Sequence, residues 1–412
     1  MELKNNSYKI QGLKLTDIAK RFGTPLYVYD ADKIVHQLQN LKNAFSNQNV
    51  KIKYAAKALT NLSILKLMKK HGAGVDVVSA QEADIALKAG FKPKDILFTP
   101  NCISFEEIVE GVEKGLMINI DNISILEQFG HKYRDQVPCC IRLNPHIMAG
   151  GNTKISTGHV DSKFGISIYQ LPHLLRVVKS NNVNVIGLHM HTGSDILDAD
   201  VFLKMAEILF GIAQDFPNLE FIDFGSGFKV AYKEGDITTN VYDLGVKLGN
   251  AFDSFCSTYG KQLEMWFEPG KYLVSEAGCL LVKVNVIKTT PATAFVGVDS
   301  GMNHLMRPMM YDSYHEIINI TNPNSIQRVY TVVGYICETD TFGWDRKIHE
   351  VRECDVLAIK KAGAYGFSMA SNYNSRYKPA EVLVYKGEAH VIRERENMED
   401  ILRKQVEMDF DE

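Results

Sequence analysis

Residues 51–72, KIKYAAKALTNLSILKLMKKHG, form the stretch that decides the fold. The apolar, β-prone run Lys51–Ala56 is followed by a turn and by a segment whose apolar side chains recur with helical spacing, as Ile64 and Met68 do. Gly72 stands where such a helix is expected to stop. The stretch therefore predicts one strand–turn–helix unit.

The same unit recurs along the chain, and two of its helices begin with a capping box, at Ser79–Glu82 and Ser104–Glu107. Strands that alternate with helices pair in parallel, because each helix returns the chain to the starting end of the sheet. Eight units predict a (β/α)8 barrel, an α/β fold; an open doubly wound sheet is the alternative, but no GxGxxG follows the first strand. The predicted strands are Lys51–Ala56, Val75–Ser79, Ile96–Pro100, Leu116–Ile120, Pro138–Leu143, Val183–His191, Leu219–Phe224 and Leu263–Phe267.

The chain changes character after Gly278. Runs such as LLVKVNVIKTT and AEVLVYKGEAHVI alternate apolar and polar residues between Gly-containing breaks, which is typical of antiparallel strands. We therefore expect a barrel over residues 31–277 and a mostly antiparallel β domain over 278–412. The N-terminal segment 1–30 is expected to add a strand, Pro25–Tyr29, to the second domain.

The composition excludes several classes of function. The 412 residues carry a net charge of −3 and no basic block, so no nucleic acid and no acidic membrane is expected as a partner. The N-terminus lacks the basic and apolar runs of a signal peptide, and no apolar run is long enough to span a bilayer. The seven cysteines are scattered and form no CxxC pair, which is typical of a reducing cytoplasm.

Ionisable residues gather at the predicted C-terminal ends of the strands, where barrels carry their active sites. Lys57, directly after the first strand, is expected to be partly desolvated, which disfavours the ammonium and leaves a nucleophilic amine. A lone lysine at a strand end is more often simply solvated, so the rest of the set matters. Its other members are Asp76, Asp121, Arg142, Asn144, His189, His191, Asp223, Glu268 and Lys271.

Glycine turns follow the last two strands. Gly225-Ser226-Gly227 comes after the seventh and Pro269-Gly270 after the eighth, the two loops with which many barrels bind phosphate. Backbone N–H groups at glycines can approach phosphate oxygens, and Ser226 or Ser194 could add a hydroxyl donor. Ordinary turn glycines are the structural alternative.

His189 and His191 share one face of the sixth strand, since side chains repeat every second residue. Such a pair could belong to a metal-dependent hydrolase, but further His ligands are not evident and we expect no metal. Stacking of His191 on a flat cofactor ring is the favoured interpretation, with a satisfied buried histidine as the structural alternative. Glu268 could then keep a ring nitrogen protonated, or form a strand-end ion pair.

Four motifs resemble the pyridoxal 5′-phosphate (PLP) enzymes of the alanine-racemase-like fold, and specifically the diaminopimelate decarboxylases: YAAKAL, HMHTGSD, IDFGSGF and FEPGKYLVSEAG. The resemblance implies that Lys57 holds PLP as a Schiff base, that His191 stacks on its ring and that Glu268 meets the pyridine nitrogen. It assigns the phosphate to Ser194, Gly225, Gly227 and Gly270, and places Asp76, Ser226, Pro269 and Lys271 around the same cofactor.

The β domain carries further motifs of that family. RPMMYDSYH holds Arg307 and Tyr311, which the resemblance assigns to a substrate carboxylate; YICETD holds Cys337 as proton donor and Glu338 as ligand of the distal amine. Tyr365 is expected to contact cofactor and substrate. The resemblance also implies a homodimer with shared active sites. An active-site loop is expected in ISTGHVDSKFGI, at Ser156, Thr157, Gly158, Lys163 and Phe164.

The function implied is decarboxylation of meso-2,6-diaminopimelate to L-lysine and CO₂, the last step of bacterial lysine synthesis. The small-molecule substrate is an amino acid with a second amino-acid head, for which Arg307 and Glu338 offer complementary charges. Alternatives are a PLP decarboxylase of ornithine, lysine, arginine or carboxynorspermidine, and a non-catalytic regulatory homologue.

The sequence departs from the family pattern at three places. Lys271 stands where the family usually has Arg, and a lysine cannot make a bidentate contact, so Lys271 could meet phosphate or substrate. Gly-Ser-Gly at 225–227 replaces a run of three glycines. The segment around Asn152 lacks the His-Pro-Tyr often found before ISTG.

Overall fold

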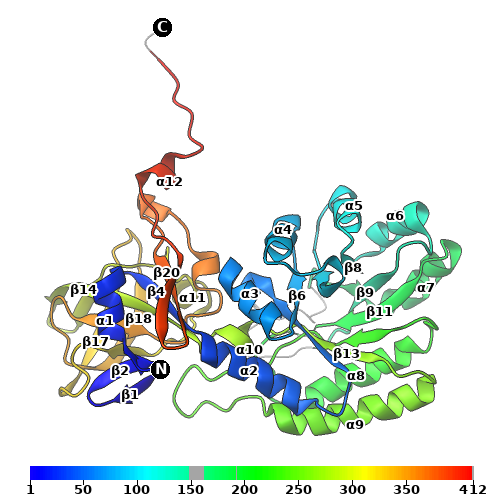
Figure 1. Ribbon diagram of the computed structural model, residues 1–412, viewed down its shortest axis with the longest axis horizontal. Helices are drawn as coiled ribbons and strands as arrows, with labels where there is room; N and C mark the ends of the chain where they lie inside the picture. The colour runs from blue at the N-terminus through cyan, green and yellow to red at the C-terminus, as the bar shows by residue number, and fades with distance from the viewer. Residues whose placement is uncertain (148–161, 192, 411–412) are drawn as a thin grey trace. The chain divides into compact units, whose positions relative to one another are not determined.

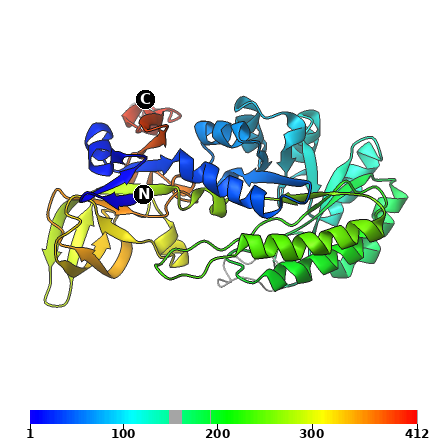
Figure 2. The ribbon, with the colours of Figure 1, turned by 60° about the horizontal axis from the view of Figure 1, so that its bottom comes forward.

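The structure is a computed structural model that describes residues 1–147, 162–191 and 193–410. It divides into two compact units, here called the barrel unit and the sheet unit, shown as ribbons in Figures 1 and 2. The barrel unit contains Val35–Ala231 and Gly235–Leu273, and the sheet unit contains Met1–Ile34, Tyr232–Glu234 and Val274–Glu412.

The barrel unit is a closed parallel barrel, which confirms the predicted fold class. Strand pairing runs β5-β6-β7-β8-β9-β11-β12-β13 and closes where β13 returns to β5, with Met265 opposite Val50. Closure excludes the open doubly wound sheet. The strands are β5 (Val50–Ala55), β6 (Gly74–Val77), β7 (Ile96–Phe98), β8 (Met117–Ile120), β9 (Cys139–Asn144), β11 (Val185–Met190), β12 (Phe221–Asp223) and β13 (Glu264–Phe267), with the short β10 (Ile166–Ser167) beside β9.

Helices cover the outside of this barrel (Figures 1 and 2). At the start of α4, Oγ of Ser79 accepts from the backbone N–H of Glu82, but the Glu82 carboxylate accepts from Val78 N, so only half of the predicted capping box forms. The helix stop predicted at Gly72 is confirmed, and Gly90 follows α4 in the same way; their positive φ values of 74° and 90° suit glycine. The helices are α2 (Ala31–Ala44), α3 (Leu62–Lys70), α4 (Ala80–Lys88), α5 (Phe105–Glu113), α6 (Ile123–Tyr133), α7 (Leu171–Ser180), α8 (Ala199–Ala213), α9 (Val241–Tyr259) and α10 (Lys271–Val274).

The sheet unit is mostly antiparallel, as predicted. Its main sheet has the order β18-β17-β15-β14-β4-β20-β21, in which only β15–β17 and β4–β20 pair in parallel. The strands are β4 (Leu26–Asp30), β14 (Gly278–Thr289), β15 (Ala294–Val298), β16 (Ile317–Asn319), β17 (Gln327–Val333), β18 (Thr341–His349), β19 (Val356–Ile359), β20 (Ala380–Tyr385) and β21 (Glu388–Arg393).

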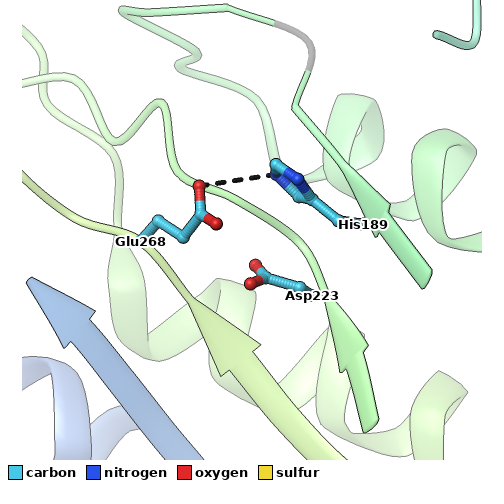
Figure 3. Close-up of side chains that lie close together, drawn as sticks. All are labelled: His189, Asp223 and Glu268. Carbon is cyan, nitrogen blue, oxygen red and sulfur yellow. Dashed lines mark ion pairs between the residues drawn. The ribbon is translucent and has the colours of Figure 1, made fainter. Parts of the chain in front are cut away.

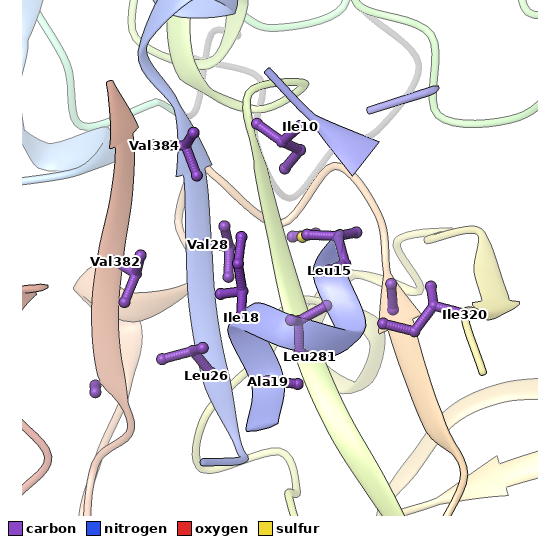
Figure 4. Close-up of a cluster of buried hydrophobic side chains, with 13 residues drawn as sticks. Ile10, Leu15, Ile18, Ala19, Leu26, Val28, Leu281, Ile320, Val382 and Val384 are labelled. Atoms are coloured by element: carbon purple, nitrogen blue, oxygen red, sulfur yellow. The ribbon is translucent and has the colours of Figure 1, made fainter. Parts of the chain in front are cut away.

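The sheet unit has its own apolar core. Helix α1 (Leu15–Phe22) packs Leu15 and Ile18 against Val28 of β4 and Leu281 of β14, as Figure 4 shows. The unit also contains the small sheet β1 (Glu2–Lys4), β2 (Ser7–Ile10) and β3 (Leu13–Lys14), and the short helices α11 (Arg307–Tyr311) and α12 (Met398–Leu402). Searched over the described residues, the chain contains no helix with the length and hydropathy of a membrane span.

Candidate active site

Lys57 lies at the C-terminal end of β5, in a short 3-10 turn over Ala56–Ala58. Its Nζ is 3.3 Å from Oδ2 of Asp76 in the neighbouring strand β6. The Lys57 side chain is 43% exposed whereas that of Asp76 is fully buried. More than half of the Lys57 side chain is thus shielded from solvent, with a carboxylate beside its amine. The partly desolvated, nucleophilic amine expected from the sequence stays a prediction.

Three ionisable side chains from adjacent strands meet inside the barrel: His189 from β11, Asp223 from β12 and Glu268, which follows β13 (Figure 3). His189 Nε2 lies 3.4 Å from Oε2 of Glu268. Nδ1 of His189 contacts the amide nitrogen of Asn119 at 2.8 Å. An amide nitrogen donates, so Nδ1 accepts and the hydrogen of the neutral ring sits at Nε2, facing Glu268.

Burial decides the protonation of this group. Burial raises the pKa of Asp223 to about 7, and burial together with the Asp223 and Asp76 charges raises the pKa of Glu268 well above its usual range. Two carboxyl groups this close in a buried site cannot both ionise easily, so the pair holds a proton near neutral pH. Burial also lowers the pKa of His189 well below its usual value, and the ring stays neutral.

The same three side chains could in principle ligate a metal, since their donor atoms lie within 4.8 Å of one another. The charges of Lys57 and Arg142 act on Glu268 at the same place. Two resident cations disfavour a third positive charge, and the carboxyl proton described above competes for the same oxygens. The group is better suited to receive a proton-bearing nitrogen than a metal ion.

His191 follows β11 and turns its ring to the glycine turn after β12. Its Nδ1 accepts from the backbone N–H of Ser226 at 3.2 Å. Burial, and then the charges of Arg142 and Lys57, lower the pKa of His191 to about 3, so the ring is neutral. A neutral, oriented imidazole is able to stack on a flat ring.

Backbone geometry requires glycine in the turn Gly225-Ser226-Gly227. Gly225 has φ 60° and Gly227 has φ 126°, and a Cβ on Gly227 would lie 2.6 Å from the carbonyl oxygen of Gly193. The N–H of Gly225 donates to Oδ1 of Asp223 at 2.8 Å, and its carbonyl accepts from Glu268 N at 2.6 Å. The turn is thus tied directly to the two buried carboxyl groups.

Lys271 begins α10 directly after Pro269-Gly270. Its Nζ lies 2.5 Å from Oδ1 of Asp195, which directly follows Ser194 in the loop after β11. A Cβ on Gly270 would lie 3.0 Å from Cβ of Ala58, so this turn also packs closely on the Lys57 segment. Ser194, Ser226, Gly270 and Lys271 therefore belong to loops at the same end of the barrel as Lys57.

The remaining predicted site residues belong to the sheet unit. Arg307 on α11 is buried; its Nη2 donates to Ser313 Oγ at 3.3 Å, and its Nε has no hydrogen-bond partner among the described residues. Tyr311 ends the same helix. Cys337 and Glu338 lie exposed between β17 and β18, with Glu338 Oε1 accepting from Tyr373 OH at 2.8 Å. Tyr365 has a left-handed backbone, φ 54°.

The predicted active-site loop is only partly within the described residues. Ser156, Thr157 and Gly158 lie outside them. Lys163 and Phe164 are described: the carbonyl of Lys163 accepts from Asn101 Nδ2 at 3.1 Å, and the Arg142 guanidinium lies 4.9 Å from the centre of the Phe164 ring.

Several residues of the site escaped sequence reasoning. Asn119 orients His189, and Asp340 accepts from the N–H groups of Met302 and Ile336 and so shapes the segment of Cys337 and Glu338. Asp195 pairs with Lys271. One signal was available for Asn119, which is a single amide inside the apolar strand MINI.

Comparisons with known proteins show what the whole chain is similar to. The family described as "Pyridoxal-dependent decarboxylase, pyridoxal binding domain" matches residues 31–275. The diaminopimelate decarboxylase of Methanothermobacter thermautotrophicus is 38% identical over 96% of this chain and 95% of its own length. The crystal structure of the Methanocaldococcus jannaschii diaminopimelate decarboxylase superposes with a TM-score of 0.90 at 34% identity, covering 99% of this chain and 98% of that one. That of Helicobacter pylori, complexed with L-lysine, has a TM-score of 0.85 at 35% identity, covering 95% and 98%.

Proposed function

Because this chain belongs to the diaminopimelate decarboxylases, a family of pyridoxal-dependent carboxy-lyases, we propose that it converts meso-2,6-diaminopimelate to L-lysine and CO₂ with PLP at the rim of the barrel. The observation that supports this most strongly is the grouping of Lys57, His191, Glu268 and the glycine turns at one end of the barrel. Relatives of 35% and 34% identity have been crystallised with L-lysine, the proposed product.

Two features of the barrel residues fit this cofactor: buried acceptor oxygens without hydrogen-bond partners within the described ranges, and a closely packed glycine turn. Oε1 of Glu268 and Oδ1 of Asp76 are buried without a hydrogen-bond partner among the described residues, so acceptors remain for a ring nitrogen and for an amine. A Cβ on Gly225 would lie 2.8 Å from His191 Nδ1 and one on Gly227 2.6 Å from Gly193 O, so glycines let this turn pack its backbone against His191 and the loop after β11, where the phosphate would be bound. Ser194, Ser226, Pro269, Gly270 and Lys271 stand in the loops around the same place.

Bound PLP would supply an aldehyde that bonds to amines and a protonated pyridine ring that takes up the electrons left when CO₂ departs. Lys57 would make the covalent bond, with Asp76 holding its ammonium until a proton is lost. Glu268 would give the proton held in the carboxyl pair to the ring nitrogen and remain beside it as the carboxylate. His191 would cover one face of the ring.

The substrate's distal head would be bound by residues of the sheet unit. The Arg307 guanidinium is buried, and its Nε–H has no hydrogen-bond partner in the described part of the chain, so it is suited to a carboxylate. Tyr311 and Tyr365 would stand beside it. Glu338 would bind the distal ammonium, and the Cys337 thiol would deliver the proton to the carbon that has lost CO₂. Both residues are exposed in one chain, which supports the proposal that they act in a homodimer whose active sites are shared.

A cytoplasmic location is part of the proposal. All seven cysteines lie among the described residues and all are free thiols, as in a reducing compartment.

The test uses the purified protein with added PLP. Violet absorbance that borohydride bleaches would support the covalent bond, and a protein that gains no such band would contradict the cofactor. Release of CO₂ is then measured with meso-diaminopimelate, L-lysine, L-ornithine, L-arginine and carboxynorspermidine, one at a time. We expect CO₂ and L-lysine from the first alone; turnover of another substrate without CO₂ from diaminopimelate would assign the site to that substrate.

A further inference from the structure

Lys271 and Asp195 form an ion pair that is largely withdrawn from solvent. Their Nζ–Oδ1 distance is 2.5 Å, and the side chains are 11% and 28% exposed. By contrast Lys247 and Asp243 on α9, 2.9 Å apart, are 46% and 47% exposed. A partly buried pair is screened less by water and salt than an exposed one, so its geometry is more firmly held.

The pair joins two of the loops to which we assign the cofactor phosphate. Asp195 directly follows Ser194 in the loop after β11, and Lys271 directly follows Gly270 after β13. The next residue, Ile196, donates from its backbone N–H to the carbonyl of Gly227 at 2.8 Å. The loop that carries Ser194 is therefore fixed on one side to the glycine turn after β12 and on the other, through the ion pair, to the turn after β13.

The charges of the pair limit what Lys271 can do alone. An ammonium already engaged by a carboxylate offers little net charge to a phosphate, and it lacks the fork with which an arginine could serve two anions at once. Asp195, in turn, would repel a phosphate near Ser194 if it lost its partner. Each side chain therefore depends on the other.

We infer that Lys271 is a positioning residue that acts on the cofactor phosphate through Asp195, chiefly by neutralising that carboxylate beside the Ser194 loop and to a smaller extent by tying the loop in place, and does not bind the phosphate or the substrate carboxylate itself. This inference rests on the proposed function, because it assigns the phosphate of PLP to these loops. It differs from the expectation that Lys271 is a direct ligand in the manner of an arginine.

The test compares four variants with the wild type: Lys271→Met, Asp195→Asn, the double variant Asp195→Asn/Lys271→Met, and Lys271→Arg. Cofactor-free protein is titrated with PLP and, separately, with pyridoxal, which lacks the phosphate. We expect Lys271→Met to raise the apparent Kd of PLP about tenfold, because it leaves the Asp195 carboxylate unpaired, and the double variant to recover to within about threefold of wild type. The Kd of pyridoxal should stay within about twofold in all of them.

A direct lysine–phosphate contact predicts the opposite pattern. Asp195→Asn alone would then tighten PLP binding by freeing the ammonium, and it would give no recovery in the Lys271→Met background. Either result, or additive losses in the double variant, overturns the inference. Lys271→Arg keeps the charge and can still pair with Asp195, so its PLP affinity should stay near wild type; a tenfold change there also counts against the pair.

Two controls separate this inference from folding and from the proposed function. Urea unfolding of the cofactor-free variants shows whether each one folds, and Lys247→Met removes the lysine of an exposed pair and should leave both affinities unchanged. Failure of the wild type itself to take up PLP would overturn the proposed function and this role with it. If the wild type takes up PLP but the double variant does not recover its PLP affinity, the role of the ion pair is overturned and the proposed function still stands.

Discussion

Oε2 of Glu268 lies 3.4 Å from Nε2 of His189 inside the barrel, where the two side chains are 7% and 0% exposed. Neither group can exchange its proton with bulk water easily, and the raised pKa of Glu268, caused first by burial, keeps a proton in the site. Glu268→Gln removes the group that can pass this proton to a ring nitrogen. We expect kcat to fall by about 10²-fold or more while PLP still binds, measured by CO₂ release and cofactor titration.

The control for that change is Glu264→Gln. Glu264 stands at the other end of the same strand, where it accepts from Trp266 Nε1 at 2.8 Å. The kcat of the Glu264→Gln variant should match that of the wild type. Wild-type turnover in Glu268→Gln would remove Glu268 from the proposed mechanism.

Lys57→Ala is expected to abolish covalent attachment of PLP and to reduce decarboxylation to background. The amine that would bond to the cofactor lies at the end of β5, 3.3 Å from Asp76. Borohydride treatment followed by mass measurement of the protein gives the readout. Lys51→Ala, at the exposed start of the same strand, should retain the cofactor mass; a permanent cofactor mass on Lys57→Ala would place the bond elsewhere.

Asp223→Asn is expected to gain stability relative to wild type as pH rises. Burial raises the pKa of Asp223 to about 7 from an ordinary value of 3.8. The folded protein therefore keeps on Asp223, between those two pH values, a proton that the unfolded chain has released, so the contribution of Asp223 to the free energy of unfolding falls as pH rises through this window. Urea unfolding of cofactor-free protein at about pH 5 and about pH 7.5 gives the difference in unfolding free energy between variant and wild type, which should shift in favour of the variant as pH rises.

The matched control is Asp253→Asn, at an exposed position of α9. It should leave the wild-type pH dependence unchanged. An Asp223→Asn protein whose stability changes with pH just as that of wild type does would show that the titrating proton sits on another group.

Gly227→Ala should harm both folding and cofactor binding. The residue has φ 126°, and an added Cβ would lie 2.6 Å from Gly193 O. We expect a loss of about 1–3 kcal/mol in unfolding free energy and weaker PLP binding. Gly260→Ala is the comparison: it also has positive φ, 83°, but nothing lies within 4 Å of its Cβ position. That variant should lose stability and keep its PLP affinity, so equal affinities in the two would contradict a phosphate role for the turn.

Arg307→Lys tests the assignment of the distal carboxylate. The guanidinium is buried with its Nε–H unsatisfied among the described residues, and a lysine cannot reproduce its two-pronged contact. KM for diaminopimelate should rise about tenfold with little change in kcat. Arg352→Lys, whose side chain is 70% exposed beside Glu350, should leave KM unchanged. An unaltered KM in Arg307→Lys would move the carboxylate site elsewhere.

The sequence was sufficient for the barrel because its signals are local. Each predicted strand overlaps an observed one, and the ends move by a residue or two, as where Leu219–Phe224 narrows to Phe221–Asp223. The apolar run and the following glycine or capping serine are properties of neighbouring residues. The number and order of the strands then follow from the helical connections, because successive parallel strands joined by a helix usually lie side by side.

The contacts within the site were less accessible to sequence reasoning. Asp195 and Lys271 are brought together from two different strand ends, and the pairing of Asn119 with His189 depends on how two side chains turn inside the barrel. The exposure of Lys57, 43% of its side chain, depends in the same way on packing. Composition and periodicity contain no information about such distances.

Strand β4 lies between β14 and β20, with Leu26 opposite both Leu281 and Ala380. During synthesis on a ribosome, this N-terminal strand emerges long before either of its neighbours exists. The barrel unit can close once β13 has been made, but the sheet unit must wait for nearly the whole chain, with the apolar face of β4 unprotected meanwhile. Synthesis that stops before β20 would therefore leave a folded barrel attached to an aggregation-prone strand, and a chaperone would be expected to recognise the segment around Leu26–Asp30.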